Sequence, residues 1–135
     1  MGKVLALDVG DVWTGMALSD PLGMIARPYT TVKTVDLEEV LSDLLVEQSI
    51  DTVIVGHPRT MKGAISEQTK KAKLVKEQLE RKFETVPWIL WDERLTSKRA
   101  QTLKKGSKKQ EKLKSHAIAA AYILDSYLEY LRVHA

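Results

Sequence analysis

The apolar positions near the start of the chain fall into two short runs. Val4–Val9 and Met16–Leu18 are separated by a polar segment that contains Gly10, Asp11 and Gly15. Short apolar runs divided by glycine and aspartate at this spacing are typical of a tight antiparallel hairpin. We therefore predict that the chain begins with two paired strands.

Asp8 lies inside the first apolar run, where a charged side chain is unusual. A strand rich in valine and leucine is typical of a buried sheet, and a lone ionised carboxylate is costly there unless a cation pairs with it. The cation can be a metal ion, or a Lys or Arg from elsewhere in the fold. The alternative is a turn-adjacent aspartate that caps the glycine-rich loop after it.

The pattern after the hairpin predicts a third strand at Tyr29–Lys33, reached through a turn over Pro21–Arg27. Asp36 is then expected to begin a helix as its N-cap, with Glu39 completing a capping box, and the helix should end near Ser49. The following elements are expected as strand, helix, strand, short helix and helix, in the segments Thr52–Val55, Ile65–Phe83, Val86–Trp91, Thr96–Leu103 and Ser115–Leu131. The last helix should bury Ala117, Ala120, Leu124, Leu128 and Leu131.

This order of elements predicts a single α/β domain over residues 1–135. An antiparallel meander would form one side of a mixed sheet, and right-handed crossover helices would add parallel strands. Ligands of such sheets gather at the carboxyl ends of the strands. The sequence places polar residues at three such ends: Asp8, then His57 and Arg59, then Asp92 and Glu93.

Composition narrows the class of protein. The 135 residues are 44% hydrophobic and 29% charged, which is typical of one globular domain with its own core. Cysteine is absent, so disulfides, zinc-thiolate sites and a thiol nucleophile are excluded. We find neither a signal peptide nor an apolar run of about 20 residues, and we expect a cytoplasmic protein without a membrane partner.

Charge is distributed unevenly along the chain. Residues 1–67 hold five Lys or Arg and ten Asp or Glu, whereas residues 68–135 hold sixteen and eight. Part of this excess is a lysine segment around Gly106 and Ser107, formed by Lys104, Lys105, Lys108, Lys109, Lys112 and Lys114. A basic loop of this kind is attracted to polyanions, and the alternative is a solvated linker without a ligand.

Four motifs together carry a resemblance to a known family. They are ALDVGDVWTGMALSD, VIVGHPRTMKG, WDERLTS and HAIAAAYILDSYL, and they occur in the family's order over nearly the whole chain. The chain resembles the YqgF/RuvX family. The resemblance implies an RNase H-like fold, a three-layer α/β/α arrangement with a five-stranded mixed sheet. It also implies a metal-dependent nuclease that hydrolyses phosphodiester bonds, in maturing the 5′ end of 16S rRNA precursor or as a Holliday junction resolvase on branched DNA.

The resemblance assigns Asp8 and Glu93 as acidic metal ligands and aligns His116 with the family's third acidic position. Carboxylates hold Mg²⁺ or Mn²⁺, and two such ions about 3.5–4 Å apart activate water and stabilise the extra charge of phosphodiester hydrolysis. Neighbouring residues of a strand face opposite ways, so Asp92 and Glu93 should not both reach the site. Asp92 is therefore the alternative to Glu93. His116 brings no negative charge and suits Mn²⁺ better than Mg²⁺. The alternative is a His at a helix start without a catalytic task.

Phosphate contacts are expected from basic residues, since Trp13 stands where the family has a basic residue in the hairpin. The indole can stack on a base or pack against a helix. The expected nucleic-acid contacts are Arg59, Lys62, Arg94, Lys104, Lys105, Lys108 and Lys109.

Two other functions are alternatives to a nuclease. One is a nucleic-acid-binding module of the same fold that has lost catalysis, which the His at position 116 favours. The other is a nucleotide-binding protein of the actin and sugar-kinase kind, which would need a second domain that 135 residues cannot provide. We find no apolar helix face left over for a dimer, and expect a monomer or weak homodimer.

Overall fold

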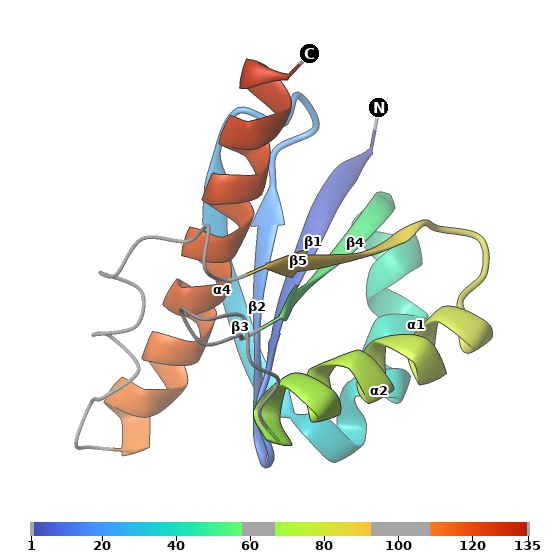
Figure 1. The fold of residues 1–135 in the computed structure, drawn as a ribbon, viewed down its shortest axis with the longest axis vertical. Coiled ribbons are helices and arrows are strands. Elements are labelled where there is room, and N and C mark those ends of the chain that lie inside the picture. Colours follow the sequence, from blue (N-terminus) through green and yellow to red (C-terminus); the bar gives the residue numbers. More distant parts are fainter. Residues whose placement is uncertain (1, 58–66, 93–108, 135) are drawn as a thin grey trace.

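A five-stranded mixed sheet forms the centre of the computed structural model, which describes residues 2–57, 67–92 and 109–134 (Figure 1). The strands lie in the order β3-β2-β1-β4-β5. Their bounds are β1 Lys3–Val9, β2 Trp13–Ser19, β3 Ala26–Lys33, β4 Ile50–His57 and β5 Trp88–Asp92. Strands β1, β2 and β3 pair antiparallel, whereas β4 joins β1 and β5 joins β4 in parallel. The meander with added parallel strands that the sequence predicts is confirmed.

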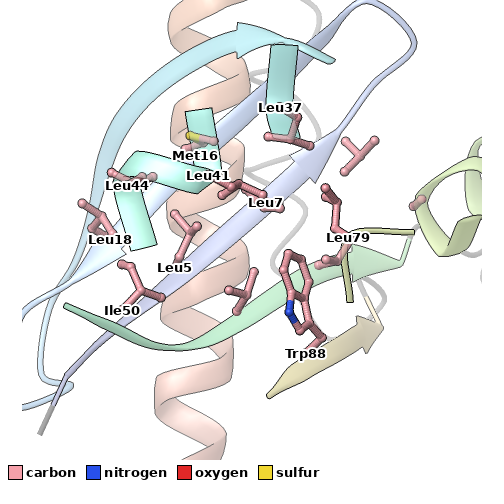
Figure 2. Close-up of a cluster of buried hydrophobic side chains, with 14 residues drawn as sticks. Leu5, Leu7, Met16, Leu18, Leu37, Leu41, Leu44, Ile50, Leu79 and Trp88 are labelled. Atoms are coloured by element: carbon pink, nitrogen blue, oxygen red, sulfur yellow. The ribbon is translucent and has the colours of Figure 1, made fainter. Parts of the chain in front are cut away.

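Helices cover both faces of this sheet. Helices α1 (Leu37–Glu47) and α2 (Glu67–Lys82) lie on one face, and α4 (Lys109–Val133) crosses the other (Figure 1). Strand residues alternate between two buried clusters, so that Leu5 and Leu7 face α1 and α2 while Ala6 faces α4. Figure 2 shows the first cluster, in which Leu5 and Leu7 of β1 lie among side chains of α1 and β5. The predicted three-layer α/β/α arrangement is confirmed.

Helix α4 packs very closely against β2, because Gly15 lacks a side chain. A Cβ atom on Gly15 would lie only 2.1 Å from the carbonyl oxygen of His116. Small side chains continue this contact, since Ala17 of β2 and Ala120 of α4 are both buried in the same cluster. Glycine in a strand interior is typical of a place where another main chain comes close. Gly15 is therefore the position at which the helix meets the sheet.

The connection from β3 to α1 differs from the predicted capping box. A 3₁₀ turn, η1 (Thr34–Asp36), precedes α1, and the Asp36 side chain makes no capping hydrogen bond. The Thr34 main-chain N–H donates to the carbonyl of Val12, and its hydroxyl donates to the carbonyl of Gly10, so the turn is tied to the first hairpin. Asp36 has φ −96° and ψ 0°, whereas a side-chain cap needs an extended residue. The predicted capping box is wrong.

Two strand and helix ends also differ from the prediction. Strand β3 begins at Ala26, before Tyr29, because its pairing with β2 extends to Ser19. Helix α4 begins at Lys109, before Ser115, so the end of the lysine segment is helical and is not a loop. Lysine, glutamine and glutamate favour helices, which accounts for the earlier start. The short helix predicted over Thr96–Leu103 lies outside the described residues.

The buried faces of the helices follow the sequence pattern with one exception. Four predicted core residues of α4 are buried: Ala117, Ala120, Leu124 and Leu128. Leu131 is instead 43% exposed and lines a groove beside the β2–β3 turn. No helix in the described ranges is both long and apolar enough to cross a membrane.

Replacing Gly15 by Ala should destabilise the fold, because the added methyl group would overlap the main chain of α4. Neither main chain can rotate out of the way as a side chain can. We expect the free energy of unfolding, measured by urea denaturation, to fall by about 2–3 kcal/mol.

Val12→Ala is the matched control, since Val12 lies in the same hairpin and is exposed. It should change the free energy of unfolding by less than about 0.5 kcal/mol. Equal stability of Gly15→Ala and the wild type would contradict the close packing of α4 on β2.

Candidate active site

Asp8 is a buried carboxylate near the carboxyl end of β1. It pairs with Gly15 of β2, and only 5% of its surface is exposed. Its neighbours Leu7 and Val9 belong to the cluster under α1 and α2. Because strand residues alternate, Asp8 faces α4. The charged group that was unexpected in the sequence thus lies between the sheet and one helix.

His116 of α4 lies directly beside this carboxylate. Its Nδ1 atom is 3.6 Å from Oδ2 of Asp8, and its side chain is 25% exposed. A distance of 3.6 Å is too long for a hydrogen bond. Among the described residues, the buried Nδ1 atom has no hydrogen-bond partner. The two groups are close enough to share a ligand but do not satisfy each other.

One glycine allows His116 to reach this position, because Gly15 lets the His116 main chain touch β2. Gly10 instead makes room for the main chain of the hairpin, since a Cβ atom there would lie 2.6 Å from the Trp13 carbonyl oxygen and at an ordinary contact distance of 3.8 Å from Cε1 of the imidazole. The Gly10 N–H donates to the carbonyl of Trp13 and closes the hairpin. His116 lies about two turns inside α4, whereas a position at the helix start was the alternative expected from sequence. The sequence pattern placed Gly15 in the turn and missed this role, although a glycine directly before the apolar run Met16–Leu18 is a signal for a close approach of another main chain.

The other two strand ends present polar residues on the opposite face. His57 of β4 and Asp92 of β5 are partners in the parallel register. Trp91 packs on the α4 side, where its Nε1–H donates to Oγ of Ser126 over 2.9 Å. Alternation therefore turns Asp92 toward the α2 side, away from Asp8. Asp8, His57 and Asp92 thus lie at the predicted edge of the sheet but on two different faces, and Arg59 and Glu93 lie outside the described residues.

Most of the remaining predicted site residues lie outside the described part of the chain. These residues are Arg59, Lys62, Glu93, Arg94, Lys104, Lys105 and Lys108. Lys109 is the first residue of α4, and its side chain is not described. Within the described ranges, no group of three or more His, Asp or Glu side chains could hold a metal ion. Asp8 and His116 thus supply two candidate ligands of the three expected.

Comparisons with known proteins identify a family that matches nearly the whole of this sequence. The family model described as "RuvX: Holliday junction resolvase" matches residues 2–130. A protein of Rubrobacter xylanophilus named "Putative pre-16S rRNA nuclease" is 40% identical over 129 residues, covering 95% of this chain and 93% of that protein. A protein of the same name from Clostridium acetobutylicum is 37% identical over 132 residues, covering 93% and 97%.

Solved structures support the same fold. Thermus thermophilus RuvC has a TM-score of 0.60 at 16% identity, with 98% of this chain and 96% of that chain covered. The RuvC chain in a complex with a Holliday junction substrate has a TM-score of 0.57 at 15% identity, with 96% of each chain covered. At such identities the likeness concerns the fold alone. From the family match and the relatives, the chain belongs to the RuvX family of nucleases, with an RNase H-like fold.

Proposed function

We propose that this protein is a metal-dependent endonuclease that hydrolyses phosphodiester bonds near the 5′ end of 16S rRNA precursor, in the cytoplasm. The observation that carries the proposal is the buried Asp8 carboxylate facing the His116 imidazole across 3.6 Å. The names of the relatives from Rubrobacter xylanophilus and Clostridium acetobutylicum supply the substrate class. The RNA is the proposed partner and a divalent cation the proposed cofactor.

The two described side chains fit a divalent cation. A carboxylate buried to this degree needs positive charge close by, and a cation at this point would supply it. The Nδ1 atom of His116 is buried without a hydrogen-bond partner in the described residues, as expected of a nitrogen that keeps its lone pair for a ligand. Carboxylate oxygen suits Mg²⁺ and Mn²⁺ alike, whereas imidazole nitrogen favours Mn²⁺. We therefore propose Mn²⁺ as the better cofactor.

Glu93 is the proposed third ligand. Trp91 and Asp92 set the alternation at the end of β5, with Trp91 on the α4 side that Asp8 also faces. Asp92 consequently belongs to the other face. Glu93 is preferred because it follows Asp92 in the sequence and carries the carboxylate that the family motif requires.

The chemistry divides between the ion and the protein. When bound, the cation supplies a polarised water and neutralises the extra negative charge of the phosphodiester under attack. Asp8 holds its position because β1 pairs on both sides, with β2 and with β4. Its burial lowers the local dielectric constant and so strengthens its attraction for cations. An imidazole ligand brings no negative charge, so the site would carry one negative charge less than an all-carboxylate site.

The substrate would be held mainly through its phosphates. The residues proposed to contact it are Arg59, Lys62, Arg94, Lys104, Lys105, Lys108 and Lys109. The excess of positive charge in residues 68–135 supports this assignment. Phosphate contacts position a nucleic acid without selecting its sequence.

Branched DNA is the second candidate substrate, favoured by the description of the matching family as a Holliday junction resolvase. A cleavage panel that compares 16S rRNA precursor with a four-way DNA junction, each in Mg²⁺ and Mn²⁺, distinguishes the two. Preferential cleavage of the RNA near its 5′ end supports the proposal. Cleavage of the junction alone would overturn the choice of RNA.

Replacing Asp8 by Asn should abolish cleavage without unfolding the protein. Asn keeps the shape of the side chain but removes the charge that holds the cation, so the rate should fall by more than about 100-fold. The stabilising effect of Mn²⁺ on the melting temperature should disappear as well. The melting temperature without metal should stay equal or rise, because a buried charge has been removed.

Asp43→Asn is the control, since Asp43 is an exposed residue of α1. It should keep both cleavage and stabilisation by Mn²⁺. Cleavage retained by Asp8→Asn would refute the assignment of Asp8.

Replacing His116 by Asp should shift the metal preference from Mn²⁺ toward Mg²⁺. The change restores a carboxylate at the position of the imidazole, and Mg²⁺ prefers oxygen ligands. We expect the ratio of the Mg²⁺-supported to the Mn²⁺-supported cleavage rate to rise by at least about tenfold.

A wild-type protein without activity in either metal, combined with an active His116→Asp variant, would favour the alternative of a binding module that has lost catalysis. An unchanged ratio would show that His116 is not a ligand.

Replacing Lys104, Lys105, Lys108 and Lys109 by Gln should weaken RNA binding and flatten its dependence on salt. Fewer counterions are released when fewer lysines contact phosphates, and each lost contact lowers the logarithmic slope by about 0.7–0.9. Fluorescence anisotropy over a series of salt concentrations measures the slope. Four lysines of α2, Lys70, Lys73, Lys76 and Lys82, provide a control of equal charge, and an unchanged slope in the first variant would identify the lysine segment as a solvated linker.

A further inference from the structure

An apolar groove lies at the end of the molecule opposite Asp8. It has a volume of about 380 Å³ and runs between the β2–β3 turn and the last turns of α4. In Figure 1 the β2–β3 connection and the end of α4 lie together near the two chain termini. Val4, Tyr127 and Leu128 line the groove on the sheet and helix side, and Leu22, Met24 and Leu131 line its open side. The groove is therefore separate from the candidate active site.

The β2–β3 turn holds two large apolar side chains out in solvent beside this groove. Leu22 is 73% exposed and Met24 is 59% exposed. Neighbouring exposed apolar side chains lower the solubility of a protein, and they often mark a surface that binds another molecule. Single exposed apolar residues are ordinary, but here they adjoin an apolar groove that the exposed Leu131 continues.

The turn is rigid because the Asp20 side chain organises it. Oδ1 of Asp20 accepts the main-chain N–H groups of Met24 and Ile25 over 2.7 and 2.8 Å, and Oδ2 accepts the N–H of Leu22 over 3.3 Å. These bonds, with that of Ile25 first, lower the pKa of Asp20. Gly23 has a φ of +69°, a left-handed conformation that other residues rarely adopt. A protruding segment held in one conformation loses little entropy when it binds.

We propose that two copies of this chain associate through the groove, with Leu22 and Met24 of each copy packed into the groove of the other. A protrusion and a groove side by side on one face can interlock with the same face of a second copy. Such a two-fold interface uses one patch on both subunits. The partner is thus a second copy of this chain, and both Asp8 sites stay open.

Charge on the groove also fits a second copy. Asp51 and Arg132 both line it, and they carry opposite charges. A two-fold interface that brings Asp51 of one copy to Arg132 of the other forms this pair of opposite charges twice. Asp51 lies near Tyr127 of the groove wall, whose pKa is raised first by burial and then by the negative charge of this carboxylate. A partner whose surface carries charge of a single sign would complement either Asp51 or Arg132, but not both.

The available area sets the strength of the association. The exposed surface of Leu22, Met24, Ile25 and Leu131 is on the order of 400–500 Å² per copy, which gives a total near the size of weak and transient interfaces. We therefore expect a dissociation constant on the order of 10–100 μM.

The experiment is sedimentation equilibrium of the whole chain from about 1 to about 500 μM. The wild type should change from monomer to dimer over this range. Leu22→Asp should weaken the association by more than about tenfold, because it places a charge in an apolar contact. Leu131→Asp, which changes α4 and leaves the turn intact, should do the same.

Val46→Asp is the matched control, since Val46 is 79% exposed on α1, away from the groove. It should dimerise as the wild type does. Circular dichroism melting checks that each variant folds, and cleavage of a short substrate should persist in all of them, since the groove is remote from Asp8.

Three results would overturn the proposal. The first is a wild type that remains monomeric at the highest concentration, which would leave the groove to a different protein. The second is a dimer that Leu22→Asp and Leu131→Asp leave intact. The third is equal weakening by Val46→Asp. None of these results bears on the nuclease proposal, which the Asp8 variants test.

Discussion

Asp8 is a charged group inside a sheet, and the fold must supply it with a partner. Strand β1 pairs on both sides in the middle of the sheet, and only 5% of the surface of Asp8 is exposed. Helix α4 covers the remaining face and brings His116 to 3.6 Å. That contact depends on Gly15, because any side chain there would push the helix away. The small residues of β2 on that face therefore set the position of α4, and the position of α4 decides which side chain lies beside Asp8.

The sequence was a good guide wherever local periodicity decides the structure. The run around Asp8 predicted β1, and the order of strands and helices predicted the mixed sheet, since crossover connections leave few arrangements. The pairing of Asp8 with His116 was predicted only through family resemblance, because 108 residues separate them. Periodicity also failed near the end of α4, where Leu131 has the spacing of a core residue but is 43% exposed. The turn before α1 was missed because Thr34 is tied to a distant hairpin.

The two ends of the sheet differ in the kind of side chains that they present. One end brings a buried carboxylate and an imidazole together, as a site that binds a cation and acts on phosphodiesters requires. The other end has a rigid turn with exposed Leu22 and Met24 beside an apolar groove. Strand direction explains this division in part, because the parallel strands β1, β4 and β5 all end at the Asp8 edge, where the polar residues at their carboxyl ends lie. Substitutions in the groove can therefore change association of the chain without changing the candidate active site.

The most direct test of the metal site is anomalous diffraction from crystals grown with Mn²⁺. The account predicts an anomalous peak within bonding distance, about 2.0–2.3 Å, of an Asp8 carboxylate oxygen and of the His116 Nδ1 atom. The Glu93 carboxylate should complete the set. Crystals in which Mn²⁺ binds elsewhere, with His116 in contact with Asp8 as a simple ion pair, would contradict it.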